Sequence, residues 1–510
     1  MKHLISKCLM VFSVIYCTFC LPFSSCIPAT ECEVLAQTST GVPTATSAAN
    51  TGESHSIAHG DPSARVFGVL ALLVICAAIG RFGARKLKQS PVLGELAVGI
   101  IVGAILYQLG SPTVIIIRHF ELIQQTAENV LSKGNDWETT VRSTLGQAGL
   151  PGEVAERVEQ VLLRKDLPAY LFLARSIQLF AGFGVVMLLF MVGLEVSLKE
   201  LKAIGGTASA VAVIGVGITF SLSCLTTFLL LPKAAGLVPP LFAGAALCAT
   251  SIGITARIFR DMRRIRMKEA RTVLGAAVLD DVLGLIVLAV VTGVAVHGSM
   301  EIGHLFWILL KTALFLVAVV IFGTRLLAKT IKFLARLDPD NIKLLYPFAL
   351  LMLLAWLADI IGLAAIIGAF AAGVIIKEES FSGLVPERSV ESILAPIEGV
   401  LAPIFFVLIG LQVNVTTLAN VEVLLTGLVL TAVAVAGKLA SSLGVRGKAD
   451  RLIVGIGMLP RVEVALIVAS MGKSLGVLDD ALYSVIIIVV LFTVLMTPPL
   501  LKWSIERKQN

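Results

Sequence analysis

The chain has 510 residues, of which 57% are hydrophobic and only 15% are charged. Soluble domains carry about 25% charged residues, so this composition excludes an ordinary soluble protein and indicates a polytopic membrane protein. The net charge of +7 does not indicate nucleic-acid binding, because the positive charges gather in loops on one side of the predicted membrane domain.

The N-terminal segment, residues 1–36, is expected to be a secretory signal peptide. Lys2 and Lys7 flank a short apolar run that ends near Leu21, and Val-Leu-Ala at 34–36 is a candidate cleavage site. The alternative is an uncleaved additional span. Residues 37–64 are rich in Thr, Ser, Ala and Gly, a composition that predicts a disordered linker.

The rest of the chain, 65–502, is predicted to be an all-α polytopic membrane domain with thirteen transmembrane helices. Each predicted span is an apolar run close to the length that crosses a bilayer as a helix. The predicted spans are 65–80, 91–107, 179–196, 207–231, 239–256, 272–296, 305–324, 344–361, 363–376, 399–413, 423–445, 452–472 and 481–501. The eighth and ninth spans are separated at Gly362.

The distribution of Lys and Arg over the short loops predicts the orientation. Loops rich in these residues alternate with loops that hold few, which places the mature N-terminus outside and the short tail, 503–510, in the cytoplasm. We therefore expect a multi-pass protein of the plasma (inner) membrane.

Between the second and third spans lies an insertion, 111–178, which should be extracytoplasmic. Its stretches 114–131 and 152–165 have helical periodicity. They predict two amphipathic helices, lying on the membrane surface or packed on the membrane domain. Their nearly balanced charges favour a structural role.

Two pairs of matching segments predict an internal repeat. Residues 93–99 (LGELAVG) match 367–373 (IGAFAAG), and residues 191–198 (MVGLEVSL) match 408–415 (LIGLQVNV). Both matches are shifted by seven spans, so the second unit begins on the opposite side of the membrane. We therefore expect two inverted six-helix repeats plus a linker helix, as in many secondary transporters. Chance similarity between apolar segments is the alternative.

Spans five and twelve carry the marks of interrupted helices. Span five gathers hydroxyls and a glycine in 249–255 (ATSIGIT), and span twelve contains Pro460 within 457–463 (GMLPRVE). Proline removes a backbone donor and opens a helix, and the helix ends at such breaks can hold ions. We expect the two breaks to cross. A simple kink is the alternative.

Side chains at these breaks are candidate site residues. Thr250 and Ser251 can supply hydroxyl oxygens to an ion, whereas Arg461 and Glu463 are expected to orient or neutralise the broken helix. Glu95, by contrast, lies near a predicted span end, so its carboxylate is expected to be solvated at the membrane interface.

Two adjacent aspartates, Asp280 and Asp281, are the only charges in 272–296. Asp281 lies ten residues after Arg271, which is roughly 15 Å along a helix and near the middle of the bilayer. An ionisable group at that depth is costly and marks a functional site. These carboxyls are predicted to hold a cation or a proton.

Lys438 is a third deeply placed charge, in span eleven. A lysine so far from the interface is expected to have a partner. We expect it to pair with Asp280, which leaves Asp281 as the ligand of the transported cation. A lysine that snorkels toward a water-filled funnel is the alternative.

The buried carboxyls predict antiport. A bare carboxylate in a moving membrane domain is too costly, but it can cross when it is neutralised by a proton or a cation. Oxygen ligands suit hard cations, and sodium is favoured over potassium. No cofactor and no enzymatic activity are expected. Channel or membrane-sensor functions, the latter signalling through 111–178, are alternatives of a different class.

Five segments in chain order resemble the monovalent cation:proton antiporter-2 family, and the resemblance extends over about 65–502. The segments are 249–262, 269–291, 364–376, 403–413 and 457–468. The resemblance implies a homodimer with a dimerisation domain and a mobile core domain, elevator-like alternating access, and a role in pH homeostasis.

The resemblance also implies roles for individual residues. Asp281 resembles the aspartate that binds ion and proton, and Thr250 lies at the crossing of the broken helices. Asp280 and Lys438 resemble the salt-bridge pair of the electrogenic members. This combination implies sodium/proton exchange, with potassium/proton exchange as the alternative.

Overall fold

The computed structural model describes residues 62–509 apart from short segments. These segments are 88, 121, 124–125, 127–128, 131–135, 148–151, 196–204, 231–235, 263, 265–266, 298–301, 335–340, 377, 382–387 and 448. The predicted signal peptide and most of the predicted linker lie outside the described residues.

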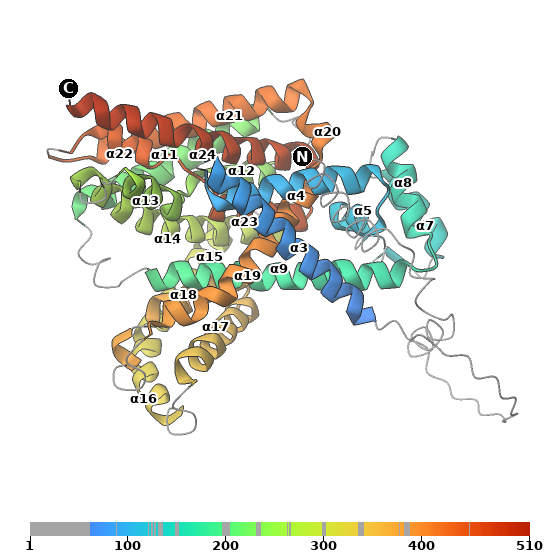
Figure 1. Ribbon diagram of the computed structural model, residues 1–510, viewed down its shortest axis with the longest axis horizontal. Coiled ribbons are helices and arrows are strands. Elements are labelled where there is room, and N and C mark those ends of the chain that lie inside the picture. The colour runs from blue at the N-terminus through green and yellow to red at the C-terminus, as the bar shows by residue number, and fades with distance from the viewer. Residues whose placement is uncertain are drawn as a thin grey trace, which may run out of the picture. The chain divides into compact units, whose positions relative to one another are not determined.

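Every regular element in the described part of the chain is helical (Figure 1). The helices are α3 (Pro62–Lys86), α4 (Pro91–Gln108), α5 (Pro112–Arg118), α7 (Trp137–Gln147), α8 (Gly152–Leu162), α9 (Leu167–Glu195), α11 (Gly206–Leu230), α12 (Val238–Cys248), α13 (Ile252–Asp261), α14 (Lys268–His297), α15 (Ile302–Ala318), α16 (Thr324–Leu334), α17 (Ile342–Ile360), α18 (Ala365–Ile375), α19 (Val390–Gln412), α20 (Val415–Leu418), α21 (Val421–Ala440), α22 (Arg451–Gly457), α23 (Glu463–Ser474) and α24 (Asp480–Gln509). Short helical turns of other types are η3 (Val319–Gly323), η4 (Glu378–Phe381) and η5 (Ser441–Gly444).

Ten of these helices are long and apolar enough to cross a membrane, and α12 and α18 are shorter apolar helices. The predicted class, an all-helical multi-pass membrane protein, is therefore confirmed. Gly362 has a φ of +78° between α17 and α18, a conformation that glycine adopts without strain, and it separates the two helices where the sequence predicted.

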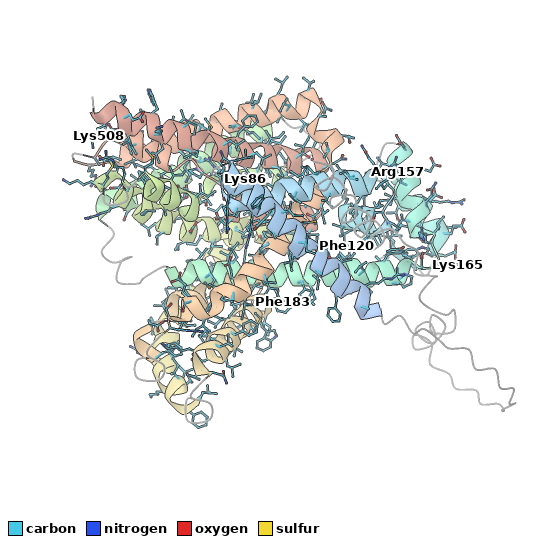
Figure 2. The ribbon with its side chains drawn as sticks, viewed as in Figure 1. Lys86, Phe120, Arg157, Lys165, Phe183 and Lys508 are labelled. Carbon is cyan, nitrogen blue, oxygen red and sulfur yellow. The ribbon has the colours of Figure 1, made fainter. Side chains whose placement is uncertain are left out.

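Several helices extend beyond the predicted spans; α19, for example, begins at Val390 rather than at 399. α9 begins at Leu167, so the last part of the segment assigned to the insertion is the first part of this helix. α24 continues to Gln509 through the predicted tail, and Lys508 lies near its end (Figure 2). Hydropathy marks only the apolar part of a span, whereas the hydrogen-bonded helix continues into its polar flanks.

The insertion contains three helices with described bounds. α5 is buried along its whole length, so this part of 114–131 packs against protein rather than lying on a surface. α8 falls within the predicted stretch 152–165, but α7 was not predicted. Trp137 at the start of α7 donates its indole N–H to the carbonyl oxygen of Leu162 at 3.0 Å.

The membrane helices within 76–101 and 180–509 form two groups by their contacts. In the first, α11 packs on α12, α14 and α21, and α24 packs on α21, α22 and α23. We call α11–α14 and α21–α24 the site bundle. In the second, α17 packs on α18 and α19, and α4 and α9 join them through the glycine contacts described next. We call this second group the scaffold. α15 contacts α14, and η3 contacts α18, so this stretch touches both groups.

Glycines bring the scaffold helices into backbone contact. Gly99 of α4 faces Gly410 of α19, and a Cβ on either would collide with a backbone carbonyl of the other helix. Gly193 of α9 and Gly373 of α18 face each other in the same way. Interiors of this density do not accept an added methyl group without displacement, so these four positions require glycine.

We expect Gly193→Ala to destabilise the protein, because the new methyl group pushes apart two helices that touch through their backbones. Overpacking of this kind costs about 1–3 kcal/mol. Gly182→Ala on the same helix is the matched control, since a Cβ there meets nothing within 4 Å, and alanine favours a helix over glycine. Thermal unfolding of both purified variants checks this. A lower midpoint for Gly182→Ala than for Gly193→Ala would contradict the packing.

Candidate ion-binding site

Two interrupted helices meet in the site bundle. α12 ends at Cys248 and α13 begins at Ile252, while α22 ends at Gly457 and α23 begins at Glu463. The intervening loops, 249–251 and 458–462, are called the crossing below. Ala249 adopts an extended backbone, which ends the first helix, and Pro460 lies in the second loop, where proline cannot continue a helix.

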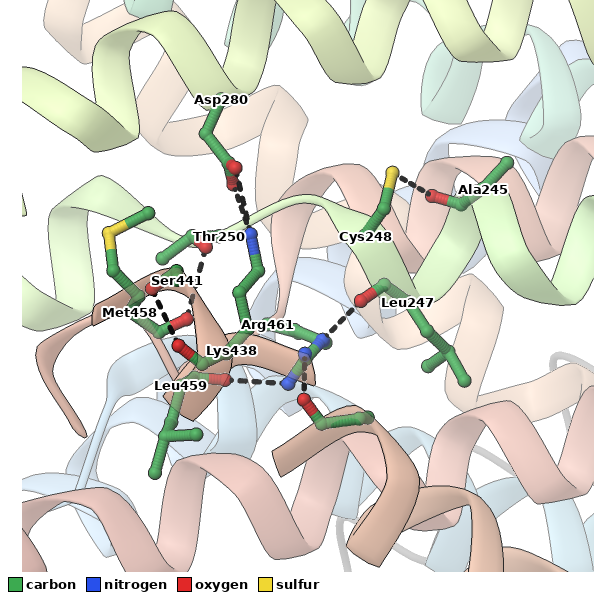
Figure 3. A network of polar contacts seen from close by, with 11 residues as sticks. Ala245, Leu247, Cys248, Thr250, Asp280, Lys438, Ser441, Met458, Leu459 and Arg461 are labelled. Atoms are coloured by element: carbon green, nitrogen blue, oxygen red, sulfur yellow. Dashed lines mark hydrogen bonds and ion pairs between the residues drawn. The ribbon is translucent and has the colours of Figure 1, made fainter. Parts of the chain in front are cut away.

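Hydrogen bonds join the two loops. The Ser251 N–H donates to the carbonyl oxygen of Pro460 at 2.8 Å. The Thr250 hydroxyl donates to the carbonyl oxygen of Met458 at 3.1 Å (Figure 3), and Thr255 donates to Gly457 at 2.9 Å. A hydroxyl that donates its one hydrogen still has lone pairs, so the oxygen of Thr250 can also coordinate a cation.

Arg461 holds the crossing together from within. It is fully buried, and its guanidinium donates to the carbonyl oxygens of Leu247 at 2.5 Å, Leu459 at 2.9 Å and Ala434 at 2.8 Å. Figure 3 shows the bonds to the first two. The sequence predicts that Arg461 acts together with Glu463, but these three bonds go to backbone carbonyls. One side chain thus satisfies an acceptor at each break and ties the end of α12 and the second loop to α21.

Asp280 of α14 and Lys438 of α21 form a buried ion pair. The Lys438 Nζ lies 2.8 Å and 2.9 Å from the two carboxylate oxygens of Asp280, and both side chains are fully buried (Figure 3). Gly215 of α11 packs against this pair, since a Cβ there would lie 3.6 Å from the lysine Nζ and 3.0 Å from the Cβ of Ser441. The structure therefore brings together the two residues that the sequence suggested as partners.

Asp281 lies beside this pair and is also buried. Residues three and four apart share one side of a helix, so Gly284 marks the side of α14 that carries both aspartates. A Cβ at Gly284 would lie 3.2 Å from Ala249 and 3.9 Å from Val464. This side of α14 therefore packs against the first loop of the crossing and the start of α23.

Ser251 and Glu463 complete the set. The Ser251 side chain is buried at the crossing, close to the half-buried carboxyl of Glu463 at the start of α23. The arrangement can offer a small cation oxygen ligands from a carboxylate and two hydroxyls, which is the donor chemistry that hard cations prefer.

Glu95 is a buried carboxylate that the sequence analysis placed at the interface. This interpretation is wrong, because Glu95 is only 1% exposed and is paired with Arg81 of α3. Gly80 and Gly94, the residues before each partner, bring α3 and α4 into backbone contact and enclose the pair. A glycine before each charged residue was the available signal in the sequence.

Comparisons with known proteins identify the family. The family described as "Sodium/hydrogen exchanger, transmembrane" matches residues 69–504, which include the whole site. The chain belongs to the sodium/hydrogen exchanger family. Its relatives include the high-affinity Na(+)/H(+) antiporter NhaS3 of Synechocystis sp., which is 33% identical over 451 residues, covering 86% of this chain and 90% of that protein. The Na(+)/H(+)-K(+) antiporter GerN of Bacillus cereus is 31% identical, covering 77% of this chain and 98% of that protein.

A solved exchanger structure has a similar fold. The sodium proton antiporter MjNhaP1 from Methanocaldococcus jannaschii, at pH 8, aligns with a TM-score of 0.58 and 17% sequence identity. The alignment covers 86% of this chain and 99% of that structure. At this identity the likeness concerns the fold.

We expect Lys438→Ala to destabilise this exchanger strongly, because it leaves the Asp280 carboxylate buried without its cation. Removing one partner of a buried pair costs about 3–5 kcal/mol. The double variant Lys438→Met with Asp280→Asn should recover much of the loss, since neither charge remains. Lys502→Ala is the control: its side chain is 68% exposed, and exposed pairs contribute about 0–1 kcal/mol. Thermal unfolding measures all three. Equal destabilisation of the single and double variants would contradict a buried ion pair.

Proposed function

We propose that this protein is a secondary active transporter that exchanges sodium for protons across the membrane. The observation that carries the proposal is a pair of adjacent buried aspartates of which one is bound by a lysine, beside two interrupted helices. Lys438 contacts both oxygens of Asp280. We assign the role of cargo ligand to Asp281, because it is an acidic side chain buried next to that pair on the same helix.

Exchange follows from competition for one carboxylate. An ionised Asp281 in the interior of the protein is neutralised either by a proton or by a cation. Thr250 and Ser251 can add hydroxyl oxygens that favour a hard cation, while Arg461 and Glu463 balance the charge of the loops. A carboxyl that cannot move between the two sides bare couples the flow of one ion to the flow of the other.

Sodium is the proposed cation, with potassium as the alternative. NhaS3 is named for sodium/proton exchange, whereas the name of GerN includes both sodium and potassium. Both relatives cover most of this chain, and the donor atoms at the crossing suit either ion. Proton movement driven by sodium, potassium or lithium in the same proteoliposomes ranks the three.

The membrane domain is proposed to contain thirteen crossings as two inverted six-helix repeats and a linker. The ten long helices, the broken pairs α12–α13 and α22–α23, and α18 make up this number. The glycine contacts support the symmetry. In the repeat, Gly99 corresponds to Gly373 and Gly193 to Gly410, so an exchange of the two repeats converts the contact of Gly99 with Gly410 into that of Gly373 with Gly193. Both contacts are present.

Elevator-like alternating access is the proposed transport movement. Asp280, Asp281, Lys438 and Arg461 all belong to the site bundle, and hydrogen bonds tie its loops to one another. A bundle tied together in this way can move as one body past the scaffold, carrying the cation with it. α15–α16 would link the two. We further propose that the scaffold forms a homodimer, with the N-terminus outside and the C-terminus in the cytoplasm.

We expect Asp281→Asn to abolish sodium-driven proton movement while the protein remains folded, because asparagine can neither release a proton nor balance a cation. The measurement is proton flux in proteoliposomes with the membrane potential clamped. Asp359→Asn, at an exposed position of α17, should behave as wild type. Full exchange by Asp281→Asn would remove this site assignment, and ion flux without obligatory coupling would favour a channel.

We propose that exchange is electrogenic, because the pair of Asp280 and Lys438 gives the site a second proton-binding unit beside Asp281. The sodium gradient at which net flux reverses should then shift when the clamped potential is changed. An electroneutral exchanger reverses where the sodium and proton gradients balance, whatever the potential. A reversal point that ignores the potential would therefore show one proton per sodium.

A further inference from the structure

We propose that Glu95 and Glu398, together with Arg81, form a staging site for the transported cation on the cytoplasmic side of the crossing. From there the cation would pass Glu463 to reach Ser251 and Asp281. This inference rests on the proposed exchange function and adds to it a separate, one-sided cation site.

The first part of the site is a buried carboxylate with one oxygen unused. Oε1 of Glu95 is bound by the Nε of Arg81, whereas Oε2 is buried and has no hydrogen-bond partner within the described residues. A buried polar atom left without a partner is unfavourable, and more so when it is charged. The carboxylate therefore presents an open oxygen that a cation can occupy.

The second part is Glu398 of α19, which is half buried. It interacts electrostatically with Arg81 and Glu95 on one side and with Glu463 on the other. Glu95 and Glu398 thus share the single guanidinium of Arg81, and Glu398 also interacts with Glu463. The excess of negative charge attracts cations, and low-dielectric walls around such a cleft strengthen the attraction.

Pairwise interactions connect these groups to the crossing, since Glu95 interacts with Glu398 and Glu398 with Glu463. Glu95 lies one turn before Gly99, the glycine through which α4 touches α19. Glu398 lies on α19, and Glu463 begins α23 beside Ser251. Arg81 is in the last part of α3, at the end of that helix that the loop charges place in the cytoplasm.

The proposed repeat gives this site no counterpart on the other side. The repeat register pairs each charged member with an alanine: Arg81 with Ala355, Glu95 with Ala369, and Glu398 with Ala181. Contacts near these residues agree with this register. Gly94 packs on the carbonyl of Gly80, and its counterpart Gly368 packs on the carbonyl of Leu354, the counterpart of Gly80. A cation that approaches from the outside would meet alanines at the equivalent positions.

The test is Glu398→Gln. This half-buried residue can lose its charge without leaving a buried charge unpaired, because Arg81 keeps its pairing with Glu95. Everted and right-side-out membrane vesicles, prepared from cells that lack other sodium/proton exchange, present the two sides to the bath. We expect the half-saturating sodium concentration to rise about 3- to 10-fold from the cytoplasmic side only, as loss of a focusing charge predicts. The maximal rate at saturating sodium should change less. Glu398→Asp should restore most of the affinity.

Glu391→Gln is the matched control, since Glu391 is exposed in the first turn of the same helix. An unchanged sodium affinity of Glu398→Gln, an equal change from both sides, or a change from the outer side alone would each overturn the staging site. A shifted pH profile at constant sodium affinity would also overturn it, by making the ligand a proton. Wild-type protein without exchange would instead overturn the proposed function, so the two failures are distinguishable.

Discussion

The satisfaction of charge and backbone polarity inside the bilayer is the constraint on which this structure depends. Water cannot complete hydrogen bonds there, so every carbonyl released by a broken helix and every ionised group requires a partner from the protein. Arg461 meets this requirement for the carbonyls of Leu247 and Leu459 at the two breaks, and Lys438 meets it for Asp280. The interruption of α12–α13 and α22–α23 is possible because these two cations are fully buried where the breaks meet.

Charge alone does not build the site, because helices must first be held at defined distances. In the scaffold this is done by glycines, which allow α4 to touch α19 and α9 to touch α18 through their backbones. Close contact of this kind is a common way to associate helices in lipid, where no hydrophobic effect drives apolar side chains together. The site bundle uses the same device at Gly437, where a Cβ would meet Thr219 of α11 next to Lys438.

The site could be predicted from the sequence where the desolvation cost of a charge and its depth in a span were informative. Asp280, Asp281 and Lys438 are conspicuous in apolar spans, and Pro460 marks a break, so their association followed from desolvation and chain geometry. The carbonyl partners of Arg461 could not be predicted, because a guanidinium accepts any well-placed acceptor and backbone acceptors exist at every residue. The burial of Glu95 was missed for a related reason: depth along one helix does not reveal a neighbouring helix in backbone contact. α7 was missed because its residues show no strong apolar period.

The proposed repeat has a functional consequence for access from the two sides. If the repeats are equivalent, exchange of their conformations opens the crossing to one side or the other at similar free energy, which a reversible exchanger needs. Any preference between the sides must then come from side chains that break the equivalence. Arg81, Glu95 and Glu398 are such side chains, because their counterparts in the repeat are alanines. Under the proposed repeat, the side from which the protein binds sodium better would therefore be set by a few charges present in only one of the two repeats.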